Sequence, residues 1–475
     1  MKPYKILLFI VLVISALATV CLFFPKDGLQ IGGVHLRFPS FEDVLVGHSV
    51  PDVQVDEVDS AALQQLNNLK DSLRQYRVAL TEGSGRFYFP DNDVSFFDPA
   101  FEAMANAKQE GRVIRVLHYG DSQIEMDRIS GNLRTFFQST FGGGGPGLVP
   151  VIQTIPSFAV SQYASGALTL YSSYGDGERC GGNYGLMAKC YRLSGSAVFG
   201  ANASRHRETD GRVKQFSRVT LLYNDRDGHF SATLRNRKGS GPEPCSNAIR
   251  GVQTCCWQLD SALTSLKISM QGNADIYGIM LDGSYGVAVD NIPLRGSSGG
   301  QFTMITDTLL RSCYRLSDVG IIIMQFGGNS VPAIHTEKAL HNYCMQVEQQ
   351  IKRIHACCPS APVLFIGPSD MSTRRGGVFQ TYPMLPQLID SLRATVLRNH
   401  AAYWDLYEVM GGQNAMVAWV QNGLAGTDYI HFTPKGAAKV GKLLASKFAL
   451  MYDCYRLRQG MDKQQLDTLW NVSAK

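Results

Sequence analysis

Gly120, Asp121 and Ser122 stand together at the end of an apolar run, in the segment LHYGDSQIEMDRI of residues 117–129. A serine between a strand and a helix can place its hydroxyl and its N–H at the positive end of the helix dipole, where an anionic intermediate would be stabilised. The same residue types also cap ordinary helices, so Gly-Asp-Ser alone does not identify a catalytic serine.

A second pair of reactive side chains lies near the other end of the chain, in GTDYIHFTPKGAAKVGKLL. Asp428 precedes His431 by three residues, ahead of a helix that we expect to be capped by Thr433 with Pro434 as its first residue. In such a turn the carboxylate can fix the tautomer of the imidazole, which leaves the far nitrogen free to take a proton from a serine. A turn-capping aspartate and a partly buried histidine are the alternative interpretation.

Two further segments could stabilise negative charge on a reacting oxygen. IIIMQFGGNS is an apolar strand that ends in Gly327, Gly328 and Asn329, and the side-chain amide of Asn329 could donate to an oxyanion. In VDNIPLRGSSGGQF, Gly296 could offer an unobstructed backbone N–H to the same charge. Each segment is also compatible with an ordinary turn after a strand.

A competing nucleophile occurs in the same glycine-rich segment. Residues 296–300 fit the Gly-x-Ser-x-Gly pattern of α/β-hydrolases, with Ser298 at its centre and the Asp-His pair following in the required order. That pattern needs a strand directly before the serine and a helix directly after it. Pro293 interrupts the strand and the neighbouring glycines weaken a helix start, so Ser122 is the preferred nucleophile.

The elements around these residues alternate between strand and helix, which is the pattern of a parallel sheet. VIRVLHY, VGIIIMQF, PVLFIGP and AAYWDLY are expected to be strands, and helices are expected directly after Ser122, near residues 336–356 and from Pro434. The first helix would carry four apolar residues on one side: Ile124, Ile129, Leu133 and Phe136. These units predict a three-layer α/β/α domain formed by residues 111–150 and 276–460.

Residues 151–275 have a different pattern. Short alternating segments such as RVTLLYN, HFSATLR and SLKISMQ are separated by turn-forming runs such as NDRDG and RKGSGPEP. We therefore expect an inserted β-sandwich that could bind glycan. Its aromatic residues are more often core than sugar-binding in such a domain, and none is assigned to binding: Tyr171, Tyr174, Tyr184 and Trp257.

The N-terminal segment decides the expected compartment. Residues 6–24, ILLFIVLVISALATVCLFF, form an uncharged run close to the roughly 20 residues that cross a bilayer. Lys2 and Lys5 precede this run, so the positive-inside rule places the short N-terminus in the cytoplasm and the bulk of the chain outside. We expect a transmembrane helix within residues 1–25, with a cleaved signal peptide as the alternative.

Residues 26–110 are expected to form a spacer followed by an amphipathic helix. Ser60 could cap this helix, whose apolar positions recur at spacings of three and four: Leu63, Leu66, Leu69, Leu73, Tyr76 and Leu80. We expect it to pack on the body of the same chain, with a short coiled coil between two chains as the alternative. Residues 461–475 are assigned as a C-terminal tail.

Composition excludes several kinds of function. The 475 residues are 45% hydrophobic, as in a globular protein, and the net charge of +5 is not gathered into a basic stripe, so nucleic acid is not expected as a partner. The stretch FGGGGPGLVP lacks the Gly-Lys-Ser/Thr ending of a phosphate-binding loop. The 11 cysteines show no zinc-ligand spacing, and disulfides are plausible in an exported chain, with their pairing open.

Gly-Asp-Ser after the first strand, a glycine in the next block, Gly-x-Asn after a later strand and Asp-x-x-His before the last helix follow one another in that order along the chain, and together they resemble the SGNH or GDSL-type hydrolases. The resemblance covers roughly residues 112–150 and 276–455, and Ser330 departs from it because many members have aspartate after the asparagine. It implies one role for each matching residue: Ser122 as nucleophile and backbone oxyanion donor, Gly296 as a second backbone donor, Asn329 as the side-chain donor, His431 as general base and Asp428 as the group that orients it.

An exported SGNH domain interrupted by a carbohydrate-module-like sandwich resembles the peptidoglycan O-acetylesterases of Gram-negative periplasms. This implies a serine esterase that removes O-acetyl groups from polysaccharide, with peptidoglycan as the favoured substrate, held by an inner-membrane anchor with its catalytic domain in the periplasm. No metal or organic cofactor is expected, because the triad and the oxyanion donors supply the chemistry.

Two alternatives stay open at this point. A polysaccharide O-acetyltransferase would use the same residues, and a non-catalytic glycan-binding envelope protein could keep the same scaffold. The acetylated sugar position and the oligomeric state are not determined by the sequence.

Overall fold

The computed structural model describes residues 73–459 apart from five internal gaps, together with short pieces near the N-terminus. The gaps are residues 84, 176, 205–209, 237–238 and 241–250, and the N-terminal pieces are residues 8, 11–13, 15–17, 19–20, 29–31 and 34–36. The chain divides into two compact units, Met1–Ser60 and Ala61–Lys475, which are described separately.

The first unit contains one short hairpin, in which β1 (Leu29–Ile31) pairs antiparallel with β2 (Val34–Leu36). The predicted anchor at residues 6–24 is described only in pieces, which are helical. A membrane-spanning helix of sufficient length and apolarity is not found among the residues that the structure describes. Much of the predicted spacer, the helix start at Ser60 and the tail at residues 461–475 lie outside the described residues.

The second unit is organised around a six-stranded sheet with the order β13-β4-β14-β15-β18-β3. Its strands are β13 (Gly286–Pro293), β4 (Val113–Gly120), β14 (Val319–Gln325), β15 (Val363–Ile366), β18 (Ala402–Trp404) and β3 (Phe87–Tyr88). All pairs are parallel except β18 with β3. Every residue of β4 is buried, as expected for a parallel strand covered on both faces. The four predicted strands are confirmed, and β13 and β3 extend the sheet at its edges.

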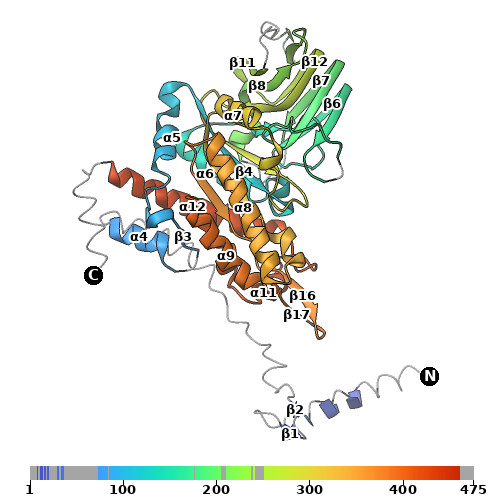
Figure 1. The fold of residues 1–475 in the computed structure, drawn as a ribbon, viewed down its shortest axis with the longest axis vertical. Helices are drawn as coiled ribbons and strands as arrows, with labels where there is room; N and C mark the ends of the chain where they lie inside the picture. The colour runs from blue at the N-terminus through green and yellow to red at the C-terminus, as the bar shows by residue number, and fades with distance from the viewer. Residues whose placement is uncertain are drawn as a thin grey trace. The chain divides into compact units, whose positions relative to one another are not determined.

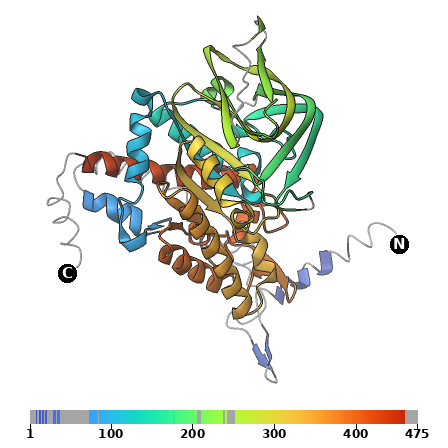
Figure 2. The ribbon, with the colours of Figure 1, turned by 45° about the horizontal axis from the view of Figure 1, so that its top comes forward.

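Helices cover both faces of this sheet (Figure 1, Figure 2). The α-helices are α4 (Leu73–Thr81), α5 (Asp98–Glu110), α6 (Ser130–Phe141), α7 (Asp307–Leu316), α8 (Glu337–Cys357), α9 (Leu385–Arg398), α10 (Leu406–Met410), α11 (Ala415–Gln421) and α12 (Pro434–Arg458). α12 packs on α4, α5 and α6, whereas α8 packs on α7 and α9. The predicted three-layer α/β arrangement is therefore observed in the described part of the chain.

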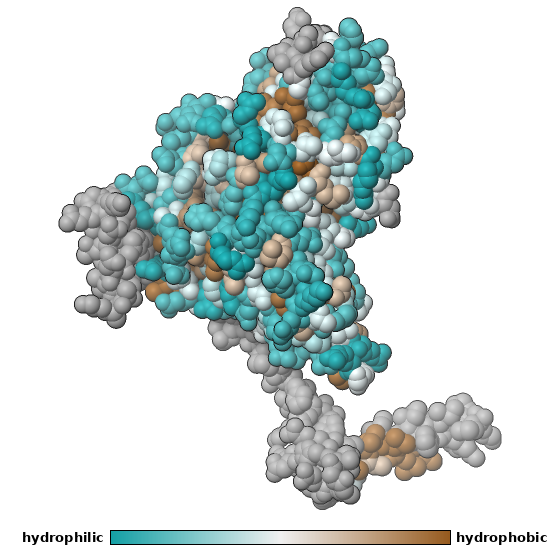
Figure 3. Space-filling model, viewed as in Figure 1, coloured by the Kyte–Doolittle hydropathy of each residue, from teal (hydrophilic) through white to brown (hydrophobic). Residues whose placement is uncertain are grey.

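Shorter elements join these layers. The 3₁₀ segments are η1 (Pro90–Asn92), η2 (Ser122–Asp127), η3 (Gly211–Lys214), η4 (Phe302–Met304) and η5 (Gly328–Ala333). A separate hairpin is formed by β16 (Ser372–Arg375) and β17 (Val378–Thr381). Figure 3 shows that one face of the unit is mostly hydrophilic, with apolar residues scattered over it.

The described part of the predicted amphipathic helix is α4, and it packs on the body of the chain. Tyr76 and Leu80 are buried, and the Lys447 ammonium donates to the carbonyl of Ala79 at 2.8 Å. This confirms intramolecular packing for residues 73–81, so a coiled coil is not needed to cover this part of the apolar face.

The prediction of a helix directly after Ser122 is wrong. The chain instead forms η2, which is kinked because Glu125 is extended and Met126 has a φ of 62°. This kink lets the Glu125 carboxylate accept from Arg295 Nε at 2.5 Å. α6 begins only after η2, so Ser122 does not lie at the positive end of a long helix dipole. In α6 the fully buried aromatic residue is Phe137 rather than Phe136.

The region predicted as an inserted sandwich forms an antiparallel sheet of eight strands. They are β5 (Gly147–Val149), β6 (Val160–Ser172), β7 (Lys189–Ala203), β8 (Phe216–Asp225), β9 (Ser231–Asn236), β10 (Gly239–Ser240), β11 (Gly251–Leu263) and β12 (Ser265–Asp282). β12 pairs with β7 over residues 265–276 and with β9 over residues 267–271, and then with β8 over residues 274–282 and with β5 over residues 279–281. This sheet therefore extends beyond the predicted residues 151–275 at both ends.

Two aromatic residues of this sheet region belong to its core, because Tyr184 and Trp257 are each only 2% exposed. Cys255 in β11 is disulfide-bonded. The free cysteines among the described residues are Cys180, Cys190, Cys256, Cys313, Cys344, Cys357, Cys358 and Cys454.

A buried ionic cluster links the antiparallel sheet to the strand that leads to Ser122. Arg115 of β4 donates to Asp282 at 2.8 Å and to Asp290 at 2.7 Å, and all three side chains are almost fully buried. Asp290 also accepts from the N–H of Leu148 at 2.7 Å. Moving one of these strands away would leave a buried charge without its partner, which is costly. The cluster therefore holds β4, β12 and β13 in place relative to one another.

Candidate active site

Three side chains from the two ends of the second unit meet at the carboxyl end of β4. Ser122 Oγ lies 2.8 Å from His431 Nε2, although the two residues are 309 positions apart. On the other side of the ring, His431 Nδ1 lies 2.7 Å from Asp428 Oδ2. If Nδ1 donates to the carboxylate, Nε2 is left to accept the serine proton, which is the arrangement of a Ser-His-Asp triad.

A tight turn before α12 aims Asp428 at the imidazole. Asp428 Oδ1 accepts from the N–H groups of Ile430 and His431, each at 3.0 Å. Partial burial alone would raise the pKa of Asp428, but the hydrogen bonds from His431 and Ile430 outweigh it and lower that pKa, so the carboxylate is ionised at neutral pH. The predicted cap is confirmed, since Thr433 Oγ1 accepts from the N–H of Gly436 at 3.3 Å.

Gln123, the residue after the candidate nucleophile, grips the backbone on both sides of His431. Its Nε2 donates to the carbonyl of Ile430 at 2.7 Å, and its Oε1 accepts from the N–H of Phe432 at 3.2 Å. The side-chain amide thus makes the same pair of hydrogen bonds as a neighbouring strand would. It fixes the distance between Ser122 and the histidine.

Arg128 makes a second link between the same two segments. Its guanidinium donates to the carbonyl of Ser122 at 2.7 Å, to that of Phe432 at 3.0 Å and to that of Glu125 at 3.0 Å. The sequence analysis did not identify Gln123 or Arg128. No local pattern marks them, because several of their partners are backbone atoms about 300 residues away.

Replacing Gln123 with alanine is expected to lower kcat for a small acetyl ester about 10- to 100-fold, because small misplacements of a catalytic group are that costly. KM should change much less, because Gln123 acts by positioning the loop that carries His431 and not by binding the substrate. The matched control is Gln138→Ala, which removes a buried amide that donates to the Gly145 carbonyl at 3.2 Å. Steady-state kinetics of both variants test this; equal losses of kcat would show a general folding effect and contradict the positioning role.

Asn329 lies at the rim of the same site, in η5 after β14. Its Nδ2 donates to Asp121 Oδ2 at 3.2 Å and to the carbonyl of Ser297 at 3.0 Å. Both amide hydrogens are therefore engaged, and the expected oxyanion role requires a substrate to displace one of these partners. Burial raises the pKa of Asp121 to about 6, against the opposing effect of the hydrogen bond from the N–H of Gln123.

Gly296 lies in an exposed turn after β13, with a φ of 74°. The next residue, Ser297, contacts the Asn329 amide, so this turn reaches the edge of the site. Gly296 is not among the residues that line the cavity beside Ser122. The structure brings the Gly296 turn to Asn329, and the role of its N–H as a donor stays a prediction.

The rival serine is placed differently. Ser298 lies in the turn after β13, and its carbonyl accepts from the Tyr343 hydroxyl at 3.1 Å. The element that follows is the short η4, so the strand-turn-helix of an α/β-hydrolase nucleophile is not formed here. In the described part of the chain, no hydrogen bond joins Ser298 to a histidine.

A cavity of about 160 Å³ opens beside the triad. Ser122, His431 and Asn329 lie on its polar side. The remaining walls are largely apolar, with contributions from Phe326, Pro332, Pro368, Met371 and Leu406. The volume and the walls suit a short acyl group held over the serine hydroxyl.

The α/β fold and the Ser-His-Asp geometry are those that the resemblance to the SGNH-type hydrolases led us to expect. A solved structure described as a peptidoglycan O-acetylesterase in action is similar to this chain with a TM-score of 0.62 and 20% sequence identity, covering 76% of this chain and 97% of that chain. This likeness confirms the predicted α/β architecture of the second unit. No protein-family model matches the chain, and no curated protein matches it.

Two further solved structures match less closely. A protein from Bacillus subtilis has a TM-score of 0.29 and 11% identity, covering 62% of this chain and 89% of that chain. A family two carbohydrate esterase from Cellvibrio japonicus has a TM-score of 0.25 and 10% identity, covering 62% of this chain and 99% of that chain.

Proposed function

We propose that this protein is a serine esterase that removes O-acetyl groups from an extracytoplasmic polysaccharide, with peptidoglycan as its substrate. The observation that carries the proposal is the contact chain from Ser122 through His431 to Asp428, with links of 2.8 Å and 2.7 Å. The small cavity beside it supports a short acyl group, and the fold of the similar peptidoglycan O-acetylesterase supports the substrate class.

In the proposed reaction, Ser122 Oγ attacks the acetyl carbonyl carbon while His431 Nε2 takes the serine proton. The ionised Asp428 stabilises the imidazolium that results. The oxyanion of the tetrahedral intermediate is bound by the N–H of Ser122 and by Asn329, after one of the amide's present partners is displaced. As the C–O bond to the sugar breaks, His431 gives its proton to the departing sugar oxygen, which leaves as a hydroxyl. Water, activated by the same histidine, attacks the acyl-enzyme and releases acetate.

We further propose that residues 1–25 hold the protein at the inner membrane with the catalytic domain in the periplasm. Support for this comes from the sequence: an uncharged run follows Lys2 and Lys5. Such an anchor would keep the enzyme within reach of the cell wall.

The proposed activity is tested by incubating the purified protein with O-acetylated peptidoglycan and measuring free acetate. We expect acetate release that is absent with Ser122→Ala and absent when the substrate has first been deacetylated with mild base. If no acetate is released, hydrolysis is not the activity. Acetyl groups that then appear on an added glycan acceptor would identify an acetyltransferase, and no acetyl turnover at all would favour a glycan-binding protein.

A further inference from the structure

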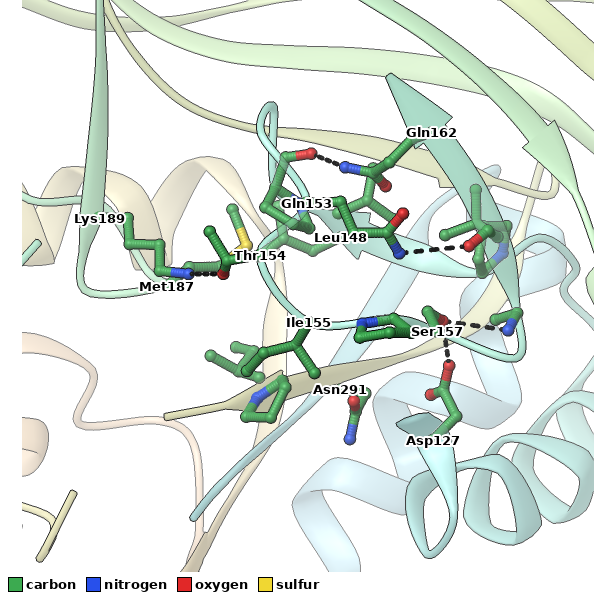
Figure 4. A pocket seen from close by; sticks show the side chains of 18 of the residues that line it. Asp127, Leu148, Gln153, Thr154, Ile155, Ser157, Gln162, Met187, Lys189 and Asn291 are labelled. Atoms are coloured by element: carbon green, nitrogen blue, oxygen red, sulfur yellow. Dashed lines mark hydrogen bonds between the residues drawn. The ribbon is translucent and has the colours of Figure 1, made fainter. Parts of the chain in front are cut away.

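A second cavity, of about 60 Å³, lies where the antiparallel sheet meets the carboxyl end of β13 (Figure 4). One water needs roughly 10–15 Å³, so the space holds several waters or a small polar group with its adjacent carbons. The loop between β5 and β6 forms one wall, and Lys189 at the start of β7 forms another. The triad mechanism uses none of these residues.

Lys189 is a buried cation in the wall of this cavity. Lys189 is only 8% exposed, and its ammonium donates to Thr154 Oγ1 at 3.0 Å. The ring centroid of Tyr174 lies 5.8 Å away. Within the described ranges the partner of the ammonium is the Thr154 hydroxyl and no ion pair with a carboxylate is formed, and burial lowers the pKa of Lys189 to about 8. A buried ammonium with one neutral hydrogen-bond partner has two donors left for an anion.

The rest of the lining offers an acceptor and apolar walls to the atoms that would carry such an anion. Gln162 Oε1 is buried and has no hydrogen-bond partner in the structure, so it can accept an N–H or O–H from a ligand. The one acid in the lining, Asp127, is already engaged by Arg134 at 2.7 Å and by the Ser157 hydroxyl at 2.8 Å. Its charge therefore does not compensate Lys189. Apolar side chains fill much of the remaining wall: Leu148, Ile155, Pro156, Met187 and Ile292.

The cavity lies one strand away from the candidate nucleophile. Pro293, which lines it, pairs with Gly120 at the end of β4, two residues before Ser122. Asn291, also in the lining, donates to the carbonyl of Ile124 at 2.8 Å. Because ligands of parallel α/β sheets bind outside the carboxyl ends of the strands, one extended substrate could reach both places.

We propose that this cavity binds a carboxylate of the substrate, with Lys189 as the residue that makes the protein prefer carboxylate-bearing glycans to neutral ones. The inference rests on the proposed esterase function, whose polysaccharide substrate it narrows. Peptidoglycan offers such a carboxylate from two sources: the lactyl group of muramic acid where no stem peptide is attached, and the carboxylates of the stem peptide where one is.

The test is binding, measured by isothermal titration calorimetry on the full chain carrying Ser122→Ala. Three probes are compared: N-acetylmuramic acid with a free lactyl carboxylate, N-acetylmuramoyl dipeptide with peptide carboxylates, and neutral N-acetylglucosamine. We expect at least one acidic probe to bind 10-fold or more tightly than the neutral sugar, and the identity of that probe assigns the source of the carboxylate. Equal binding of all three would overturn the proposal.

Lys189→Met is the decisive variant, since it keeps the length and apolar stem of the side chain and removes the charge. We expect it to abolish the preference for the acidic probe, whereas Lys267→Met, which removes an exposed lysine from the same sheet, should keep it. An unchanged thermal midpoint for Lys189→Met would show that the fold is intact. Retained preference in Lys189→Met contradicts the site. Because binding needs no turnover, a failure of acetate release by the unmodified protein would count against the esterase function separately.

Discussion

Ser122→Ala is expected to lower kcat for hydrolysis of 4-nitrophenyl acetate by about 10⁵- to 10⁶-fold, the size of effect seen when the nucleophile of a serine hydrolase is removed. The reason is that the Ser122 hydroxyl is the group that His431 can deprotonate, at 2.8 Å. The residual rate should come only from binding and from the oxyanion donors, which can retain roughly 10³-fold over water.

Ser298→Ala is the matched control for this variant, because Ser298 lies in a neighbouring turn and makes no described contact with the imidazole. It should turn over at nearly the unmodified rate. The opposite pattern, with Ser122→Ala active and Ser298→Ala inactive, would move the nucleophile to the glycine-rich turn after β13.

His431→Ala should cause a loss of kcat of similar size, about 10⁵- to 10⁶-fold, because serine and histidine act as one unit. Adding Ser122→Ala to it should therefore lower kcat little further. Kinetics of the two single variants and the double variant provide the measurement. His341→Ala, which removes an exposed histidine from α8, serves as the control and should retain activity. Multiplicative losses in the double variant would argue that the two groups act independently and that the triad is not formed.

Those parts of the site that depend on local sequence were predictable. The turn from Asp428 to His431 needs only three residues and a capped helix, and both are visible in the sequence. The apolar runs of β4 and β14 are buried on both faces of a sheet, so their composition identifies them. The contact between Ser122 and His431 joins segments that are 309 residues apart. It could therefore be predicted only from the order of the motifs along the chain.

Features that depend on tertiary partners could not be predicted in this way. The kink of η2 accompanies the ion pair between Glu125 and Arg295, which are 170 residues apart. β13 carries Asp290, which is unusual for a buried strand and becomes intelligible only with Arg115 beside it. The clamp that Gln123 makes on the histidine loop likewise exists only in three dimensions.

The antiparallel sheet runs from Gly147 to Asp282 and not over the predicted residues 151–275, again because a contact between distant segments decides where it ends. The apolar second half of β12 resembles a strand of the parallel domain, yet it continues the antiparallel sheet through a register shift at Gly278, where φ is 153°. A side chain at that position would meet Leu148 and Met187 at 2.7 Å and 2.8 Å, so glycine lets the strand bend while staying packed.

Mass spectrometry of the protein after reaction with a serine-reactive fluorophosphonate tests the central claim most directly. The account predicts a single covalent adduct on the peptide that contains Ser122, formed in step with the loss of acetate release from O-acetylated peptidoglycan. An adduct on a different serine that accompanies the same loss, or complete inactivation without modification of Ser122, would contradict it.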